Sequence, residues 1–284
     1  MTTMILVTGA AGKTGLAVIQ ALARRGIHVR ALVRRAAQAA AVQQRGAQSV
    51  VVGDLLQATT LRTALAGCQA VYHICPNMHP QEAVIGEMML AAAMDAGISH
   101  FVYHSVLHPQ TEAMPHHWLK LRVEEQLFTT GLPYTILQPC AYMHNILGSW
   151  QAITRQSIYP IPYPVTTRLS LVDLADVAEV AARVLTEPGH QTATYELVGT
   201  PGLMQTEVAA TLSQVLGQPI KAQELSLATW EARARAAGMS DYALDTLLRM
   251  FRYYAAYGLV GNPTVLTYLL GRAPTSLAAF LTHI

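Results

Sequence analysis

Three glycines, spaced three residues apart directly after a short apolar strand, constrain this chain more than any other feature. The segment reads Met4-Ile-Leu-Val-Thr-Gly-Ala-Ala-Gly-Lys-Thr-Gly15, and apolar residues follow it at helical spacing. Strand, glycine turn and helix in this order put a helix N-terminus beneath a diphosphate. Gly9 is expected to make the tight turn, Gly12 to let the backbone approach the ligand, and Gly15 to allow close packing. The predicted dinucleotide contacts in the turn are Gly9, Ala11, Gly12, Lys13, Thr14 and Gly15.

The glycines have two alternative interpretations. Such turns also occur without a ligand, and Gly12-Lys13-Thr14 imitates the end of a nucleoside-triphosphate loop. That loop needs a glycine five residues before its Gly-Lys pair, where this chain has Val7. Lys13 is therefore expected to act only as a point charge near the ligand phosphates.

The composition limits the classes of partner. Of the 284 residues, 52% are hydrophobic and 13% are charged, which favours a homo-oligomer or a deep pocket. The net charge of +2 gives no basis for nucleic-acid or membrane binding. We therefore expect a small-molecule substrate as the main partner.

Cysteine usage and the start of the chain point to one compartment. The three cysteines form no close pair and no metal spacing, as is typical of a reducing cytosol. The first strand leaves no room for a signal peptide, and no apolar run reaches the roughly 18–20 residues of a membrane helix. We expect a cytoplasmic protein.

Strand and helix patterns alternate through the first half of the chain, which predicts a parallel sheet covered on both faces. A glycine follows each helix, where a left-handed cap is wanted. The predicted strands are 4–8, 28–33, 48–53, 69–75, 100–105 and 133–138. The predicted helices are 14–25, 36–45, 57–66, 80–96 and 117–130, each followed by one of Gly26, Gly46, Gly67, Gly97 and Gly131.

The pattern changes after Pro139. We expect an extended loop over 157–168, a helix over 173–185, a strand over 193–198, and mostly helix from Gln205 on, with a short strand near Leu225–Leu227. The fold class is thus α/β, a Rossmann-type doubly wound parallel sheet with a smaller, mostly helical C-terminal substrate region. The predicted NADP-binding domain is 1–150, to which 170–198 returns. Residues 151–169 and 199–284 form the predicted substrate and lid region.

The ends of the second, third and fourth strands indicate which nucleotide is bound. An acid after the second strand would bind the ribose of NAD, whereas an arginine accommodates the 2′-phosphate of NADP. This strand carries no acid, so Arg34 is the candidate for the 2′-phosphate, with Arg35 as helper. The alternative is a solvated surface pair. The predicted cofactor is NADP(H). Further predicted contacts to the nucleotide are made by Asp54 and Leu55, and by the backbone of Cys75 and Pro76. The alternative role of Asp54 is the N-cap of the next helix.

A family resemblance follows from residues 100–145. The strand His100-Phe-Val-Tyr-His-Ser105 precedes a helix with His116-His117-Trp-Leu-Lys120, and then come Gln138-Pro139 and Tyr142-Met143-His144-Asn145. Together with the glycine turn, these residues resemble the NmrA-like branch of the atypical short-chain dehydrogenases/reductases. Two later segments agree, Ser170-Leu-Val-Asp-Leu-Ala-Asp176 and the ending Leu270-Gly-Arg-Ala-Pro-Thr-Ser. Pro139 and Tyr142 join the predicted cofactor contacts.

The resemblance implies a catalytic Tyr-x-x-x-Lys pair, which departs here from its usual form. Lys120 matches the lysine that orients the nicotinamide ribose, while His116 takes the place of the tyrosine. Val106 stands where many relatives place a catalytic serine, with Ser105 just before it. His116 is the candidate proton donor, because imidazole titrates near neutral pH. The alternatives are a solvated helix-start ring for His116 and a surface ion pair with Glu124 for Lys120.

The 11 histidines complete no ligand spacing, so no metal is expected.

The expected function is that of an NADPH-dependent oxidoreductase acting on a quinone or another conjugated small molecule. The alternatives are a non-catalytic NADP(H)-sensing regulator of the NmrA type and, third, a lyase or isomerase. The residues expected to line the substrate site are Tyr142, Met143, Trp150, Tyr163, Trp230, Phe251, Tyr254 and Tyr257. The alternative for each of them is ordinary packing in the core.

Overall fold

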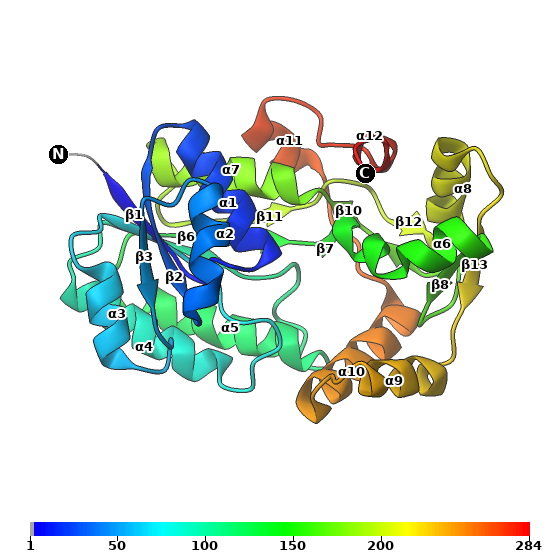
Figure 1. The fold of residues 1–284 in the computed structure, drawn as a ribbon, viewed down its shortest axis with the longest axis horizontal. Coiled ribbons are helices and arrows are strands. Elements are labelled where there is room, and N and C mark those ends of the chain that lie inside the picture. The colour runs from blue at the N-terminus through cyan, green and yellow to red at the C-terminus, as the bar shows by residue number, and fades with distance from the viewer. Residues whose placement is uncertain (1–2) are drawn as a thin grey trace. The chain divides into compact units, whose positions relative to one another are not determined.

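The computed structural model describes residues 3–284 (Figure 1). Contacts between Cα atoms divide the chain into two units. The first, here called the sheet unit, runs to Gln110 and continues over Leu119–Gln138 and Val177–Tyr195. The second, here called the C-terminal unit, comprises Thr111–Trp118, Pro139–Asp176 and Glu196–Ile284. The predicted domain boundaries at 150, 170 and 198 remain predictions.

The sheet has seven strands in the order β11-β6-β5-β4-β1-β2-β3. Its strands are β1 Met4–Val7, β2 His28–Val33, β3 Ser49–Val52, β4 Ala70–His73, β5 His100–His104, β6 Tyr134–Pro139 and β11 Ala193–Leu197. Every pairing from β3 across to β6 is parallel. The order reverses between β1 and β4, which is the topological switch point where ligands bind in doubly wound sheets. The predicted Rossmann-type fold is confirmed.

Helices cover both faces of this sheet, α1, α2 and α7 on one side and α3, α4 and α5 on the other (Figure 1). Their bounds are α1 Lys13–Arg24, α2 Ala39–Gln44 after a short 3-10 turn η1 Ala36–Gln38, α3 Ala58–Leu65, α4 Glu82–Asp95, α5 Pro115–Phe128 and α7 Leu174–Thr186. Aliphatic side chains of α3, α4 and α5 pack in one buried core with β1, β4 and β5, and β5 contributes the aromatic Phe101 and Tyr103.

Local signals set most helix ends as predicted. All five glycines expected after helices have a positive φ, from 63° to 106°. The predicted helix over 117–130 begins two residues earlier, at Pro115, because proline is tolerated in the first helical turn, where its missing N–H costs nothing.

The C-terminal unit joins small strand pairs to helices. β7 Ala141–Tyr142 pairs with β10 Leu171–Val172, β9 Arg168–Leu169 with β12 Leu203–Met204, and β8 Ile158–Ile161 with β13 Lys221–Glu224. Its helical elements are η2 Met143–Ser149, α6 Trp150–Gln156, α8 Gln205–Leu216, α9 Leu227–Ala236, α10 Asp241–Tyr257, α11 Thr264–Leu270 and α12 Leu277–Thr282.

Two expectations for this unit were wrong in detail. Residues 158–161 of the expected loop form a strand, and the strand expected near 225–227 lies at 221–224. Each of these segments becomes a strand by pairing with the other, far away in sequence. Separately, no helix within residues 3–284 has both the length and the apolar character needed to span a bilayer.

Candidate functional site

The glycine turn at the carboxyl end of β1 holds α1 close to the sheet. Gly9 has a φ of +56°, and a Cβ atom there would lie 2.9 Å from Cβ of Ile74. A Cβ atom on Gly15 would lie 2.5 Å from the carbonyl oxygen of Gly9 and 2.6 Å from Cα of Ala10. Any side chain at either position would fill the space that the backbone needs. The turn thus requires glycine at both positions.

The N-terminus of α1 is open to an anion. Gly12 precedes the helix, and its N–H donates to the carbonyl of Gly9 at 3.0 Å. The first turn of α1 contains no carboxylate and begins with Lys13, which is exposed together with Gly12. Backbone N–H groups of a first helical turn have no partner within the helix, and the helix dipole favours negative charge there. Both features fit a diphosphate.

The side chains that follow β2 and β3 differ in whether they already have hydrogen-bond partners in the protein. Arg34 and Arg35 are exposed, and neither forms an ion pair within residues 3–284, although the N–H of Arg35 donates to Gln38 Oε1 at 3.0 Å. Asp54 accepts the N–H of Leu56 at 2.9 Å, two residues on. Helix α3 begins later, after Gln57, so the alternative role of Asp54 as its N-cap is wrong.

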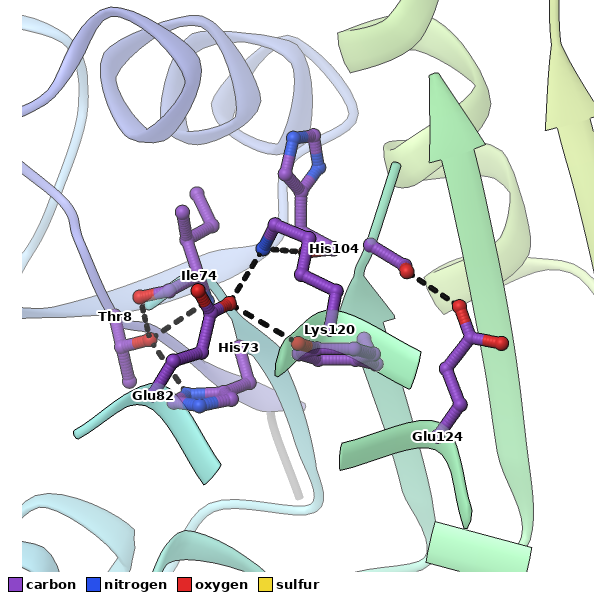
Figure 2. Close-up of polar contacts among 9 residues, drawn as sticks. Thr8, His73, Ile74, Glu82, His104, Lys120 and Glu124 are labelled. Carbon is purple, nitrogen blue, oxygen red and sulfur yellow. Dashed lines mark hydrogen bonds and ion pairs between the residues drawn. The ribbon is translucent and has the colours of Figure 1, made fainter. Parts of the chain in front are cut away.

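A hydrogen-bonded threonine links the ends of β1 and β4. Oγ1 of Thr8 accepts the N–H of Ile74 at 2.8 Å and lies 3.0 Å from both the carbonyl of Ile74 and Nδ1 of His73 (Figure 2). Cys75 follows and is buried, whereas Pro76 is exposed. The contact fixes the spacing of the two strands at the switch point. It thereby holds the backbone of Cys75 and Pro76 at the sheet edge.

Lys120 is buried and ion-paired. Its Nζ donates to Oε1 of Glu82 at 2.7 Å and to the carbonyl of His104 at 3.0 Å, and lies 5.4 Å from the ring centroid of Tyr103. The hydroxyl of Tyr103 donates to the same Glu82 oxygen at 3.2 Å. Figure 2 shows Lys120 directed toward Glu82 and away from Glu124. The alternative of a surface ion pair between Lys120 and Glu124 is therefore wrong.

Burial controls the charges around this lysine. It lowers the pKa of His73 and of His104 to about 3, with the Lys120 charge adding to the effect, so both rings are neutral at pH 7. Nδ1 of His104 lies 2.7 Å from the hydroxyl of Tyr72. Burial, reinforced by Glu82, raises the pKa of Cys75 far above its usual range. A thiol with so high a pKa is not a redox nucleophile.

Ser105 belongs to a second buried cluster. Its hydroxyl donates to Oε1 of Glu124, and Nε2 of Gln138 donates to both carboxylate oxygens at 3.0 and 3.1 Å. Burial raises the pKa of Glu124, while these hydrogen bonds and the Lys120 charge oppose the rise. The Ser105 hydroxyl is therefore oriented by Glu124.

Three further predicted site residues lie in the C-terminal unit. His116 is half-buried at the start of α5, and its ring centroid lies 6.1 Å from that of the fully buried His117 in an edge-on arrangement. Pro139 is buried at the end of β6, and Tyr142 is half-buried in β7. The alternative for His116 was a solvated ring at the start of the helix, whereas its ring is partly enclosed in the structure.

Several of the expected aromatic walls gather in one place. Tyr163, Phe251, Tyr254 and Trp230 form a chain of ring contacts with centroids 4.8 to 6.2 Å apart. An open groove of about 390 Å³ borders this cluster and is lined by Pro162, Tyr163, Pro164, Glu224, Leu227, Phe251, Arg252, Ala255 and Ala256. Met143 is instead fully buried in core, and Tyr257 is 76% exposed.

The residues present fit a dinucleotide. The turn, the carboxylate-free start of α1 and the exposed guanidinium groups of Arg34 and Arg35 suit phosphates. Among residues 3–284, no three histidine, cysteine or acidic side chains come together as metal ligands would. Sequence reasoning missed Glu82 and Gln138. The one available signal was the acid at the expected start of the fourth helix.

Comparison with known proteins gives the family. The model of the NmrA-like family matches residues 1–278. An NAD(P)H azoreductase of Xenophilus azovorans is 30% identical over 279 residues, which cover 98% of this chain and 96% of that one. Quinone oxidoreductase 2 of Escherichia coli (strain K12) is 30% identical over 283 residues, covering 99% and 98%. The crystal structure of an NADPH-dependent quinone oxidoreductase from Escherichia coli, complexed with NADPH, superposes with a TM-score of 0.86 at 29% identity, over 99% of both chains. This chain belongs to the NmrA-like family.

Proposed function

We propose that this chain is an NADPH-dependent oxidoreductase that reduces a quinone or another conjugated small molecule. The observation that carries the proposal is the glycine turn Gly9–Gly15 at the switch point of the sheet, here called the cradle. This turn leaves the N-terminus of α1 open to a diphosphate. The names of the relatives support the reaction type, because two proteins that are 30% identical over nearly the whole chain are named as an NAD(P)H azoreductase and a quinone oxidoreductase.

The residues of the sheet unit divide the work of holding NADPH. The turn from Gly9 to Gly15 binds the diphosphate, Arg34 with Arg35 binds the 2′-phosphate, and Asp54 with Leu55 borders the adenine. The backbone of Cys75 and Pro76 borders the nicotinamide half. When bound, NADPH supplies the hydride. Lys120 donates to the nicotinamide ribose and so orients the ring. Pro139 and Tyr142, which belong to the C-terminal unit, remain predicted contacts.

Proton supply differs from that of a tyrosine-dependent dehydrogenase. His116 stands one helical turn before Lys120 and serves as the proton donor. Ser105, whose hydroxyl is oriented by Glu124, assists as a hydrogen-bonding group. A conjugated substrate delocalises the charge that arrives with the hydride, so it needs little acid catalysis. This requirement favours quinones and related compounds over simple ketones.

The alternative is a non-catalytic NADP(H)-sensing regulator. A regulator would need the same cradle but would not consume the nucleotide. The enzyme names of these two relatives, an azoreductase and a quinone oxidoreductase, favour catalysis. The homo-oligomer and the cytoplasmic compartment expected from the sequence remain predictions, as does the conjugated character of the substrate.

A titration followed by a turnover panel tests the proposal. Purified protein is titrated with NADPH and with NADH, and then mixed with NADPH and, in separate samples, a naphthoquinone, an azo dye and a simple ketone. We expect NADPH to bind more tightly than NADH and to be consumed with the quinone or the dye but not with the ketone. Tight binding without consumption in any sample would favour the regulator instead.

A further inference from the structure

We propose that Glu82 is the positioning residue for Lys120, holding its ammonium group in the direction of the nicotinamide ribose. This inference rests on the proposed function, because it concerns how the lysine is presented to NADPH. Glu82 itself is not expected to touch the nucleotide. It would act through the 2.7 Å ion pair between its Oε1 and Nζ of Lys120 (Figure 2).

The contacts of the ammonium group leave one donor for a ligand. A lysine ammonium carries three N–H donors. Within residues 3–284, two acceptors are within reach, Oε1 of Glu82 and the carbonyl of His104. These two come from different elements, α4 and β5, so they fix the direction of the third N–H. The ring of Tyr103, 5.4 Å from Nζ, adds attraction from a further direction.

The position of Glu82 suits the carboxylate of a buried ion pair. It is the first residue of α4, where the helix dipole favours negative charge. The Tyr103 hydroxyl also donates to it. The side chains of Lys120 and Glu82 are only 6% and 1% exposed. Since burying an ion pair costs more desolvation than its attraction returns in many proteins, stability alone is a weak reason for this pair. A role in presenting a charge is a stronger one.

The surroundings make Glu82 the main counter-charge of Lys120. Other groups whose electrostatics involve this lysine include His73, Cys75, His104 and Glu124. The two histidines are neutral near pH 7, and burial keeps the thiol protonated. Glu124 is directed to Ser105 and Gln138 instead. Replacing Glu82 would therefore leave a buried ammonium without its ion-pair partner.

The test is a double-mutant cycle on nucleotide binding. Glu82→Gln, Lys120→Met and the double variant are titrated with NADPH and, separately, with adenosine 2′,5′-bisphosphate, which lacks the nicotinamide ribose. Glu87→Gln is the matched control, because Glu87 lies on the same helix and is exposed. Glu82→Asp retains the charge with a shorter reach. Thermal unfolding of each variant reports folding separately from binding.

We expect Glu82→Gln to weaken NADPH binding roughly tenfold, the effect of one hydrogen bond to a charged group, and to leave bisphosphate binding unchanged. In the Lys120→Met background the same substitution should have no further effect on NADPH binding, since Glu82 acts only through Lys120. Glu82→Asp should recover part of the affinity, and Glu87→Gln should match the wild type.

Four results would overturn the inference. Equal loss of NADPH and bisphosphate binding in Glu82→Gln would make Glu82 a structural residue of the whole cradle. An additive loss in the double variant would mean that it does not act through Lys120. Lower thermal stability with unchanged NADPH affinity would make it a residue of folding alone. A wild-type protein that binds the bisphosphate but gains nothing from the nicotinamide half would overturn it as well, whereas NADPH binding without turnover would overturn only the proposed reductase activity.

Discussion

A Cβ atom on Gly15 would lie 2.5 Å from the carbonyl oxygen of Gly9, closer than any real contact of that kind. Helix α1 can therefore follow β1 so tightly only because residue 15 has no side chain. At Gly12 the situation differs. A Cβ atom there would meet only the Gly9 carbonyl, at 3.2 Å, and its φ of −77° suits any residue. The two glycines are thus separable by experiment.

The pair Gly15→Ala and Gly12→Ala should separate folding from ligand binding. Gly15→Ala should lower the free energy of unfolding by roughly 1–3 kcal/mol, as overpacking does, and weaken NADPH binding because α1 must move. Gly12→Ala should leave stability within about 1 kcal/mol of the wild type while weakening NADPH binding, because its methyl group points at the ligand. Urea unfolding and NADPH titration measure both. Equal stability losses in the two variants would contradict this account of the turn.

Replacing Arg34 should change the choice of nucleotide. Its guanidinium is exposed and free of ion pairs within residues 3–284. Arg34→Ala should therefore reduce the preference for NADPH over NADH by roughly tenfold or more, by removing a charge-assisted bond to the 2′-phosphate. NADH affinity should not change. Arg62→Ala, at an exposed arginine on α3, is the control and should leave the preference intact. An unchanged preference in Arg34→Ala would assign the 2′-phosphate elsewhere.

Buried neutral histidines should make the fold sensitive to mild acid. Burial lowers the pKa of His73 and His104 to about 3 and of His100 to about 4. An unfolded histidine titrates near pH 6.5, so the unfolded state binds more protons below that pH, and stability is lost as the pH falls. At one pH unit below 6.5, each histidine lowers the free energy of unfolding by about 1.4 kcal/mol, so the three together lower it by about 4 kcal/mol.

The free energy of urea unfolding at about pH 7.5 and about pH 5.5 checks this sensitivity. His73→Asn should lose about 1.4 kcal/mol less than the wild type between these pH values, whatever its stability at the higher one. The exposed His283→Asn should behave like the wild type. A His73→Asn variant with the wild-type pH dependence would mean that His73 is not a buried neutral ring.

Asp176 should be a stability residue of the C-terminal unit. Its fully buried carboxylate accepts hydrogen bonds from Nη2 of Arg272 at 2.8 Å, and from N and Oγ1 of Thr275 at 2.6 and 3.1 Å. Asp176→Asn should lower the free energy of unfolding by about 2–4 kcal/mol, since it uncouples a buried charge pair. Asp245→Asn breaks only an exposed pair with Arg249 and should cost less than about 1 kcal/mol. Similar losses in both would show that the Asp176 contacts add nothing specific.

The fold was predictable from the sequence because its signals are local. Six strands, the intervening helices and the glycines that end them follow from apolar periodicity and from backbone freedom at single positions. The strand pair formed by residues 158–161 and 221–224 was not predictable. Each of its strands depends on hydrogen bonds to a partner more than 60 residues away, and no local pattern encodes that pairing.

The surroundings of the site were predictable only in part. Helical spacing placed Lys120 and Glu124 near one another and suggested a surface pair. Both side chains are buried, and each has a partner from another element, Glu82 on α4 and Ser105 beside β5. Such partners depend on how the elements pack, which residue spacing along one helix does not specify.

A single-turnover experiment tests the central claim most directly. Protein loaded with one equivalent of NADPH, deuterated at the C4 position that donates hydride, is mixed with a naphthoquinone without oxygen, and the nicotinamide absorbance is followed. The account predicts that bound NADPH is oxidised much faster than free NADPH, with a slower rate for the deuterated cofactor and with hydroquinone formed in equal amount. NADPH that stays bound and unoxidised in the presence of quinones and azo dyes would contradict it.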